Sequence, residues 1–269
     1  MPNKAKSSLN FIKFECMKTL VSVLFLLFCH YSCFADCGGN GLSVFPTEAI
    51  VPGNSKIMIE GFAESVKIIT SINGKHQAWL TSKYSRIRLK AIRSFSGQVS
   101  LAQTILSPET TPNPEITYTL VIDSLPDGEK LMRYNTQTGK NDSIRFCFSK
   151  PNDIASPILF STPVLEEKED RPHFCTPSNY VTFTSPIIEN SGYFVIATLR
   201  DKITGKVTIG CLVPHSGLVS VGFMGCSGMV SFDDKHRYDI SFEYIDICGN
   251  RCLGPGAITF TPAPHGKRM

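Results

Sequence analysis

The stretch Arg237-Tyr-Asp-Ile-Ser-Phe-Glu-Tyr-Ile-Asp246 places apolar side chains at every second position from Tyr238 to Tyr244. Successive side chains of a β-strand point to opposite faces, so this alternation predicts a strand with one buried face. Similar short runs recur after residue 35, and no long segment shows the 3.6-residue period of an amphipathic helix. The sequence therefore predicts an all-β fold.

The predicted strands are short and are separated by turn sequences such as Asn73-Gly74 and Asp201–Gly205. They fall near residues 42–45, 56–60, 66–72, 77–81, 86–92, 98–103, 117–123, 143–148, 158–161, 180–184, 193–200, 206–213, 218–223, 228–232, 237–245 and 257–261. Many short strands at spacings of about 8–12 residues are typical of β-sandwiches.

A polar segment with two prolines, Ser149–Pro157, divides the strands into two groups. We therefore expect one sandwich at residues 36–149 and a second at residues 157–262, with a linker at residues 150–156 and a flexible tail at residues 263–269. A single large sandwich over residues 36–269 is the alternative.

The N-terminal segment predicts export. Met17-Lys18-Thr19 is followed by the nine-residue apolar run Leu20–Phe28 and then by Cys33-Phe-Ala35, which is the pattern of a signal peptide. The run is shorter than the roughly 20 residues that span a bilayer. We expect residues 1–35 to be cleaved, with the true start at Met17. The mature protein would be secreted or lie in the periplasm or cell envelope, without a lipid anchor; an uncleaved membrane anchor is the alternative.

Charge excludes one class of partner. The formal net charge of the whole chain is +4, but residues 1–35 hold four lysines and one glutamate, so the mature chain carries about +1. This small charge gives no electrostatic support for nucleic-acid binding. The hydrophobic content of 42% is that of a globular protein.

Short motifs in both halves match one kind of domain. They are Phe45–Asn54 with Lys56–Glu60, Thr117–Ile122, Ala155–Pro157, and Arg237–Asp246 with Gly249-Asn250. Together they resemble bacterial Ig-like domains of the surface-layer and Ig-repeat types. The resemblance implies two tandem immunoglobulin-like β-sandwiches in a secreted or cell-envelope setting, but it implies no activity, because this fold carries many functions.

Export makes disulfides the expected state of the cysteines. Cys248 and Cys252 have a spacing that a tight turn can close. The Ig-like resemblance implies a bridge between Cys37 and Cys147, because the first and last strands of such domains are often neighbours.

In the second half we expect Cys175 to pair with Cys226. Cys211 would then remain a free thiol, buried because it shares an apolar face with Val207, Ile209 and Val213. A bridge between Cys211 and Cys226 is the alternative.

No motif of a catalytic nucleophile or a phosphate loop occurs in the sequence. The best candidate pair is His173 with Cys175 or Cys226, and oxidation of these cysteines would disable it, so we expect no enzyme.

Zinc at Cys248 and Cys252 lacks a second ligand pair. Calcium could bind at oxygen ligands near the ends of loops; these are Asp233, Asp234, Asp246 and Asn250. A turn-shaping role is favoured for Asp246 and Asn250, and we expect neither a metal nor a small-molecule cofactor.

One strand offers a candidate contact face. Arg86, Arg88 and Lys90 alternate with apolar residues, so they share one side of the predicted strand, and Tyr84 and Trp79 flank it. This side is either a solvated sheet face, which is favoured, or a contact for a glycan or protein at the cell surface. The expected function is that of a non-catalytic structural or adhesive binding protein. The alternative is an accessory subunit or inhibitor of a secreted hydrolase, with a site between the modules.

Overall fold

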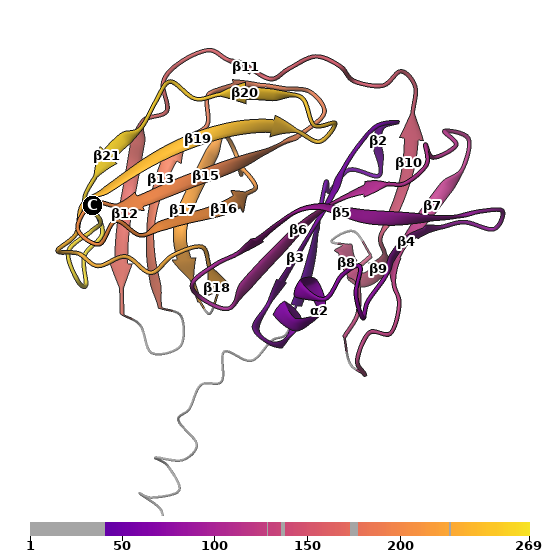
Figure 1. The fold of residues 1–269 in the computed structure, drawn as a ribbon, viewed down its shortest axis with the longest axis horizontal. Coiled ribbons are helices and arrows are strands. Elements are labelled where there is room, and N and C mark those ends of the chain that lie inside the picture. Colours follow the sequence, from indigo (N-terminus) through magenta and orange to yellow (C-terminus); the bar gives the residue numbers. More distant parts are fainter. Residues whose placement is uncertain (1–40, 128, 136–137, 173–176, 226) are drawn as a thin grey trace, which may run out of the picture. The chain divides into compact units, whose positions relative to one another are not determined.

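Strands make up most of the described chain, which confirms the all-β class (Figure 1). The computed structural model describes residues 41–269 except residues 128, 136–137, 173–176 and 226. The expected signal peptide, Cys37, His173, Cys175 and Cys226 therefore lie outside the described residues. The described residues belong to one compact unit. Among them, no helix has the length and apolar character needed to cross a membrane.

The first half forms a sheet with the strand order β1-β3-β6-β5-β4-β7-β10-β2. These strands are β1 (Gly41–Phe45), β2 (Ile50–Pro52), β3 (Ile57–Phe62), β4 (Ala78–Thr81), β5 (Arg86–Ser96), β6 (Leu101–Pro108), β7 (Thr117–Ile122) and β10 (Arg145–Ser149). Neighbours are antiparallel except β10 and β2, which are parallel. A separate hairpin joins β8 (Met132–Asn135) to β9 (Lys140–Ser143).

The long strand β5 connects two groups of strands. Residues 86–89 pair with β4, whereas residues 89–96 pair with β6, with a register shift between Ala91 and Arg93. Such a bulge bends a strand and increases its twist. One strand can therefore belong to the β1-β3-β6 group at one end and to the β4-β7-β10 group at the other.

The strand predicted at residues 66–72 is wrong. A 3₁₀ turn, η1 (Ala63–Ser65), leads into the helix α2 (Val66–Thr70). Ile68 and Ile69 are both buried, and two consecutive buried side chains do not fit a strand with one buried face. Gly61 makes this packing feasible, because a Cβ at that position would lie 2.6 Å from Ile69 Cγ1.

The second half forms two main sheets, visible in Figure 1. One has the order β12-β13-β17-β18, and the other has the order β16-β15-β19-β20, with β21 also paired to β19. Their strands are β12 (Leu165–Arg171), β13 (Ser178–Thr184), β15 (Tyr193–Asp201), β16 (Val207–Leu212), β17 (Leu218–Met224), β18 (Ser227–Gly228), β19 (Tyr238–Asp246), β20 (Arg251–Leu253) and β21 (Ile258–Phe260). The short strands β11 (Ile158–Leu159) and β14 (Ile187–Ile188) pair with each other.

The core consists of two clusters, and β15 contributes to both. Val195 and Ala197 belong to the cluster between the two sheets of the second half. Phe194 and Ile196 point to the opposite face and belong to the cluster of the first half. This explains why β15 is a continuous apolar run and does not alternate, because both of its faces are covered.

The C-terminal residues depart from the expected flexible tail. The backbones of Lys168 and Met269 form two hydrogen bonds of 2.8 Å with each other, and Asp170 N donates to Lys267 O at 2.8 Å. The tail therefore lies along the edge of β12. The strand ranges predicted from the sequence do not include β12, which pairs with β13 from Leu165 to Arg171.

Candidate functional site

The three predicted basic residues lie on β5, on the same side of the sheet as Trp79 of β4. Trp79 is paired in register with Arg88, and Thr81 with Arg86. The row continues through Thr119 of β7 to Arg145 of β10. We call this surface the basic face and define it by Gln77, Trp79, Arg86, Arg88, Lys90, Asp123 and Arg145. Ile87 and Leu89, the neighbours of these cations on β5, are buried as the alternation predicts.

Trp79 and Arg86 form the centre of the basic face. The guanidinium carbon of Arg86 lies 4.0 Å from the centroid of the Trp79 ring, which is a cation–π contact. Asp123 holds both residues. Its Oδ2 accepts a hydrogen bond of 2.7 Å from Trp79 Nε1, and its two oxygens accept from Arg86 at 2.7 and 2.9 Å. Arg86 therefore covers the ring of the tryptophan, so a sugar could not stack on that side of it.

The remaining cations of the basic face are less engaged. Arg88 donates from Nε and Nη2 to Gln77 Oε1, at 3.0 and 2.7 Å, so its partner is neutral. Lys90 and Arg145 are exposed. Asp123 is the one carboxylate in this set of seven residues, against four cations. In the part of the chain that the structure describes, neither Arg88 nor Lys90 is in an ion pair, so the basic face can attract an anion there without first breaking one.

Tyr84 lies at the turn before β5 and is 76% exposed. The ammonium of Lys83 lies 5.5 Å from its ring centroid, so Tyr84 is accompanied by a further cation. Sequence reasoning missed Asp123 and Gln77, although both stand at the ends of predicted strands. Their role follows from the pairing of β4 with β5 and β7, and a single sequence does not specify that pairing.

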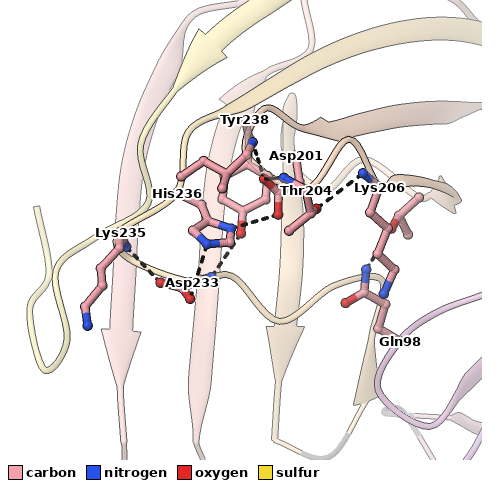
Figure 2. A network of polar contacts seen from close by, with 10 residues as sticks. Gln98, Asp201, Thr204, Lys206, Asp233, Lys235, His236 and Tyr238 are labelled. Atoms are coloured by element: carbon pink, nitrogen blue, oxygen red, sulfur yellow. Dashed lines mark hydrogen bonds and ion pairs between the residues drawn. The ribbon is translucent and has the colours of Figure 1, made fainter.

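A polar network lies at one end of the β15–β16 hairpin (Figure 2). His236 Nδ1 and Asp201 Oδ2 are 2.8 Å apart, and His236 Nε2 lies 3.6 Å from Asp233 Oδ2. Asp201 Oδ1 also accepts from the backbone N–H groups of Ile203 and Thr204, at 2.8 and 3.2 Å. A hollow of about 230 Å³ is lined by Asp201, Thr204 and His236, together with Asp233.

The network holds two turns together. Burial raises the pKa of Asp201, but the hydrogen bonds from His236, Ile203 and Thr204 outweigh it and lower the pKa to about 2. Asp201 is therefore a carboxylate that accepts several hydrogen bonds, which is a stabilising arrangement for a turn. The contacts of His236 are with two aspartates, and sequence reasoning did not single out this histidine as part of a network.

A second hollow, of about 240 Å³, is lined by residues of both halves. Gln103 donates to Glu60 Oε2 at 2.7 Å and to Cys211 O at 2.6 Å, and Cys211 N donates to Gln103 Oε1 at 3.1 Å. Burial raises the pKa of Glu60. Burial, and then the charge of Glu60, raise the pKa of the Cys211 thiol. A thiol that stays protonated is a poor nucleophile.

Cys211 is fully buried, but the explanation from alternation is incomplete. Val207 and Ile209, on the same side of β16, are 45% and 42% exposed. Only the end of β16 that carries Cys211 reaches the core cluster of the first half.

The predicted disulfide between Cys248 and Cys252 is not formed in the structure, where both are free thiols. Cys248 lies in the turn after β19, buried beside Ser55 Oγ at 3.8 Å, and burial raises the pKa of its thiol to about 11. Cys252 lies on β20, where it is paired with Tyr244 of β19, and it packs against the core cluster of the second half. Cys147 is also a free thiol, and its Sγ lies 3.6 Å from Pro114 O.

The four oxygen-bearing residues considered for calcium are separated by the fold. Asp233 and Asp234 precede β19, whereas Asp246 ends it. Asp246 Oδ1 accepts from the backbone of Cys248 and Asn250 at 2.9 and 2.8 Å, and this confirms the turn-shaping role.

Asp246 instead lies near two other carboxylates. One oxygen each from Asp153, Glu189 and Asp246 lies within 4.8 Å of the others. Such hard oxygen ligands could hold a divalent cation. Burial, and in smaller part the charge of Glu189, raise the pKa of Asp246, against the hydrogen bonds from Asn250 that lower it.

No protein-family model matches the chain, and no curated protein matches it. Among solved structures it is similar to a pullulanase from Anoxybacillus sp. LM18-11 complexed with maltotriose, at 11% identity, over 77% of this chain and 25% of that chain, with a TM-score of 0.22. The pullulanase type I from Bacillus subtilis str. 168, complexed with maltose, gives 9% identity over 79% of this chain and 24% of that chain, with a TM-score of 0.24. The chain spans about a quarter of the length of these pullulanases. A likeness with such TM-scores carries no argument about function.

Proposed function

We propose that the chain is an exported, non-catalytic binding protein made of two immunoglobulin-like β-sandwiches, and that its basic face contacts an anionic partner at a cell surface. The observation that carries the binding role is the basic face itself, where four cations of β5 and β10 and the carboxylate of Asp123 lie on the same side of the sheet as Trp79.

The order of the strands supports the immunoglobulin-like part of the proposal. In such folds one sheet contains strands A, B and E, and the other contains C, F and G, with C′ beside C in the variable type. In the second half β12, β13 and β17 follow the order A-B-E, and β16, β15, β19 and β20 follow the order C′-C-F-G. In the first half β1-β3-β6 and β4-β7-β10 take the same places, and β5 joins them.

A repeated turn gives independent support. Tyr118, near the start of β7, accepts a hydrogen bond of 3.1 Å at its Oη from the backbone N–H of Asn113. Tyr238, at the start of β19, accepts one of 3.0 Å from the backbone N–H of Asp233. Both donors are five residues earlier, as in the tyrosine corner of β-sandwiches. The two halves therefore use the same device at the corresponding strand.

The alternative, a hydrolase subunit with a site between the modules, would need reactive groups in the hollow that both halves line. The titratable groups there include Glu60 and Cys211, whose pKa values are raised. Cys211 is fully buried. These properties favour structural packing over nucleophilic chemistry at this position.

The proposal is tested by binding of the mature protein to heparin, an anionic glycan, and to polyglutamate, an acidic polypeptide. The double variant Arg88→Glu/Lys90→Glu should lose at least tenfold in affinity. The control Lys235→Glu/Arg237→Glu has the same net charge and should bind as the wild type does. A wild-type protein that binds neither probe, or equal losses in both variants, would overturn the proposed role of the basic face. The preferred probe distinguishes a glycan from a protein partner.

A further inference from the structure

The edge of β12 is occupied by a segment of the same chain. β12 lies at the end of its sheet, with β13 on one side. On the other side Lys168 exchanges two backbone hydrogen bonds of 2.8 Å with Met269, and Asp170 N donates to Lys267 O. Glu169 and Arg268 form an antiparallel bridge. Residues 267–269 therefore extend the sheet by a short strand.

The side chains at this edge select for positive charge. Arg268 Nε lies 2.6 Å from Glu167 Oε1 and 3.7 Å from Glu169 Oε2. His265 Nδ1 lies 2.8 Å from Asp170 Oδ2, and the same oxygen accepts from Gly266 N at 3.1 Å. Three carboxylates of β12 thus face the tail.

A hollow continues the acidic surface beyond the strand edge. It has a volume of about 480 Å³, and its lining includes Asp170, Asp233, Asp234 and His265. His265 N donates to Asp234 Oδ2 at 3.0 Å, so the tail lies at the hollow and leaves space for a larger cationic side chain.

The tail is attached in a way that permits exchange. Pro262 and Ala263 are buried, whereas residues 264–269 are all exposed. The side chains of His265 and Arg268 are 73% and 62% exposed. Exposed ion pairs contribute little to stability, and short segments with few buried contacts open readily. A ligand in trans must nevertheless compete with a tethered segment, whose effective concentration is on the order of millimolar.

We infer that the edge of β12 is a docking site for an extended basic peptide of another protein, which adds to the sheet as a strand in place of residues 265–269. Main-chain hydrogen bonds to Lys168 and Asp170 supply the pairing, as in other complexes formed by strand addition. Glu167 selects an arginine or lysine at the position of Arg268, and Asp170 selects a cation at the position of His265. The tail acts as an intramolecular competitor. This surface is separate from the basic face and attracts ligands of the opposite charge, so it goes beyond the function proposed above.

The test uses a peptide with the sequence of residues 263–269 as the probe, measured by calorimetry. A variant that ends at Ala263 should bind this peptide at least tenfold more tightly than the full chain does. A probe carrying Arg268→Glu should lose most of the affinity. Absence of binding to the folded truncated variant, or equal binding of both probes, would overturn the inference.

A full-length Arg268→Glu variant covers the case in which truncation prevents folding. This substitution removes the ion pairs of Arg268 with Glu167 and Glu169 and keeps residues 264–269 in the chain. The variant should therefore bind the unmodified probe more tightly than the wild type does. Failure of this gain would contradict the inference. If the wild-type protein forms a dimer that requires residues 264–269, the partner at the edge of β12 is a second copy of the chain. This result would also contradict the inference.

Discussion

The loop before β7 and the loop before β19 are built alike but are surrounded differently. In both, an Asn or Asp accepts at its side chain from the backbone N–H two residues later, at 3.0 Å for Asn113 and 2.9 Å for Asp233. In both, the residue five positions later is the tyrosine that closes the loop. Among the described residues, only the second loop adds an ionisable network, in which His236 contacts Asp201 and Asp233. The comparison shows that neutral hydrogen bonds suffice to shape this loop, whereas the lowered pKa of Asp201 predicts that the network at the second loop responds to acid.

The strand β15 contributes buried side chains to the cores of both halves. Residues of β15 fill the cluster of the second half from one face and the cluster of the first half from the other. A substitution on one face of β15 should therefore lower the free energy of unfolding of both halves.

The largest expected effect comes from Ile196→Ala, which removes a buried side chain of the second half from the cluster of the first. Truncations of this kind cost about 2–5 kcal/mol. Trp79 is the single tryptophan and lies in the first half. Denaturant unfolding followed by its fluorescence should shift together with circular dichroism. Thr198→Ala, on the same strand, is the control, and an unchanged Trp79 transition in the Ile196 variant would contradict the shared core.

The next effect concerns the repeated corner. Tyr118→Phe and Tyr238→Phe each leave a backbone N–H without its acceptor, which costs about 1–3 kcal/mol. We expect similar losses of unfolding free energy in both, because the geometries are alike. Tyr244→Phe is the matched control, since its buried hydroxyl has no hydrogen-bond partner among the described residues. A loss in the Tyr244 variant as large as in the other two would show that the corner hydrogen bond is not responsible.

A smaller effect is expected from Glu60→Gln. Burial raises the pKa of Glu60, so its contribution to stability is complete below the pKa of the unfolded chain and is lost as the pH rises through the folded value. The variant should therefore be more stable than the wild type at pH 7, and the difference should shrink on acidification. Thermal unfolding at several pH values measures it, with the exposed Glu115→Gln as the control. A variant less stable than the wild type at pH 7 would refute this assignment.

The smallest effect sharpens the comparison of the two loops. The pKa of Asp201 is lowered from 3.8 to about 2, so the stability it contributes is present above about pH 4 and is lost as the pH falls toward 2. Asp201→Asn keeps the acceptor oxygen and should flatten this part of the stability profile. Asn113→Asp, at the neutral loop, serves as the comparison. An unchanged acid profile in the Asp201 variant would rule out the network as its source.

Much of the fold could be predicted from alternation, because a strand such as β19 with one covered face shows it directly. The prediction failed where burial did not follow a single face. Consecutive buried isoleucines were taken for a strand but form the helix α2. No strand was predicted over the charged run of β12, because its pairing with β13 and with the distant tail leaves no local pattern.

Only part of the candidate site could be predicted, because the sequence shows alternation within a strand but not the pairing between strands. The common side of Arg86, Arg88 and Lys90 follows from their spacing, but the partners Asp123 and Gln77 depend on how strands are paired. Spacing also misled the assignment of Cys248 and Cys252, because the turn directs these side chains to different core clusters.

The most direct test of the proposed binding role is a map of amide chemical-shift changes when a heparin oligosaccharide is added to the ¹⁵N-labelled mature protein. The account predicts changes concentrated on β4, β5, β7 and β10, around Trp79, Arg88 and Lys90. Changes confined to the polar network at His236, or to the hollow at Glu60 and Cys211, would contradict it.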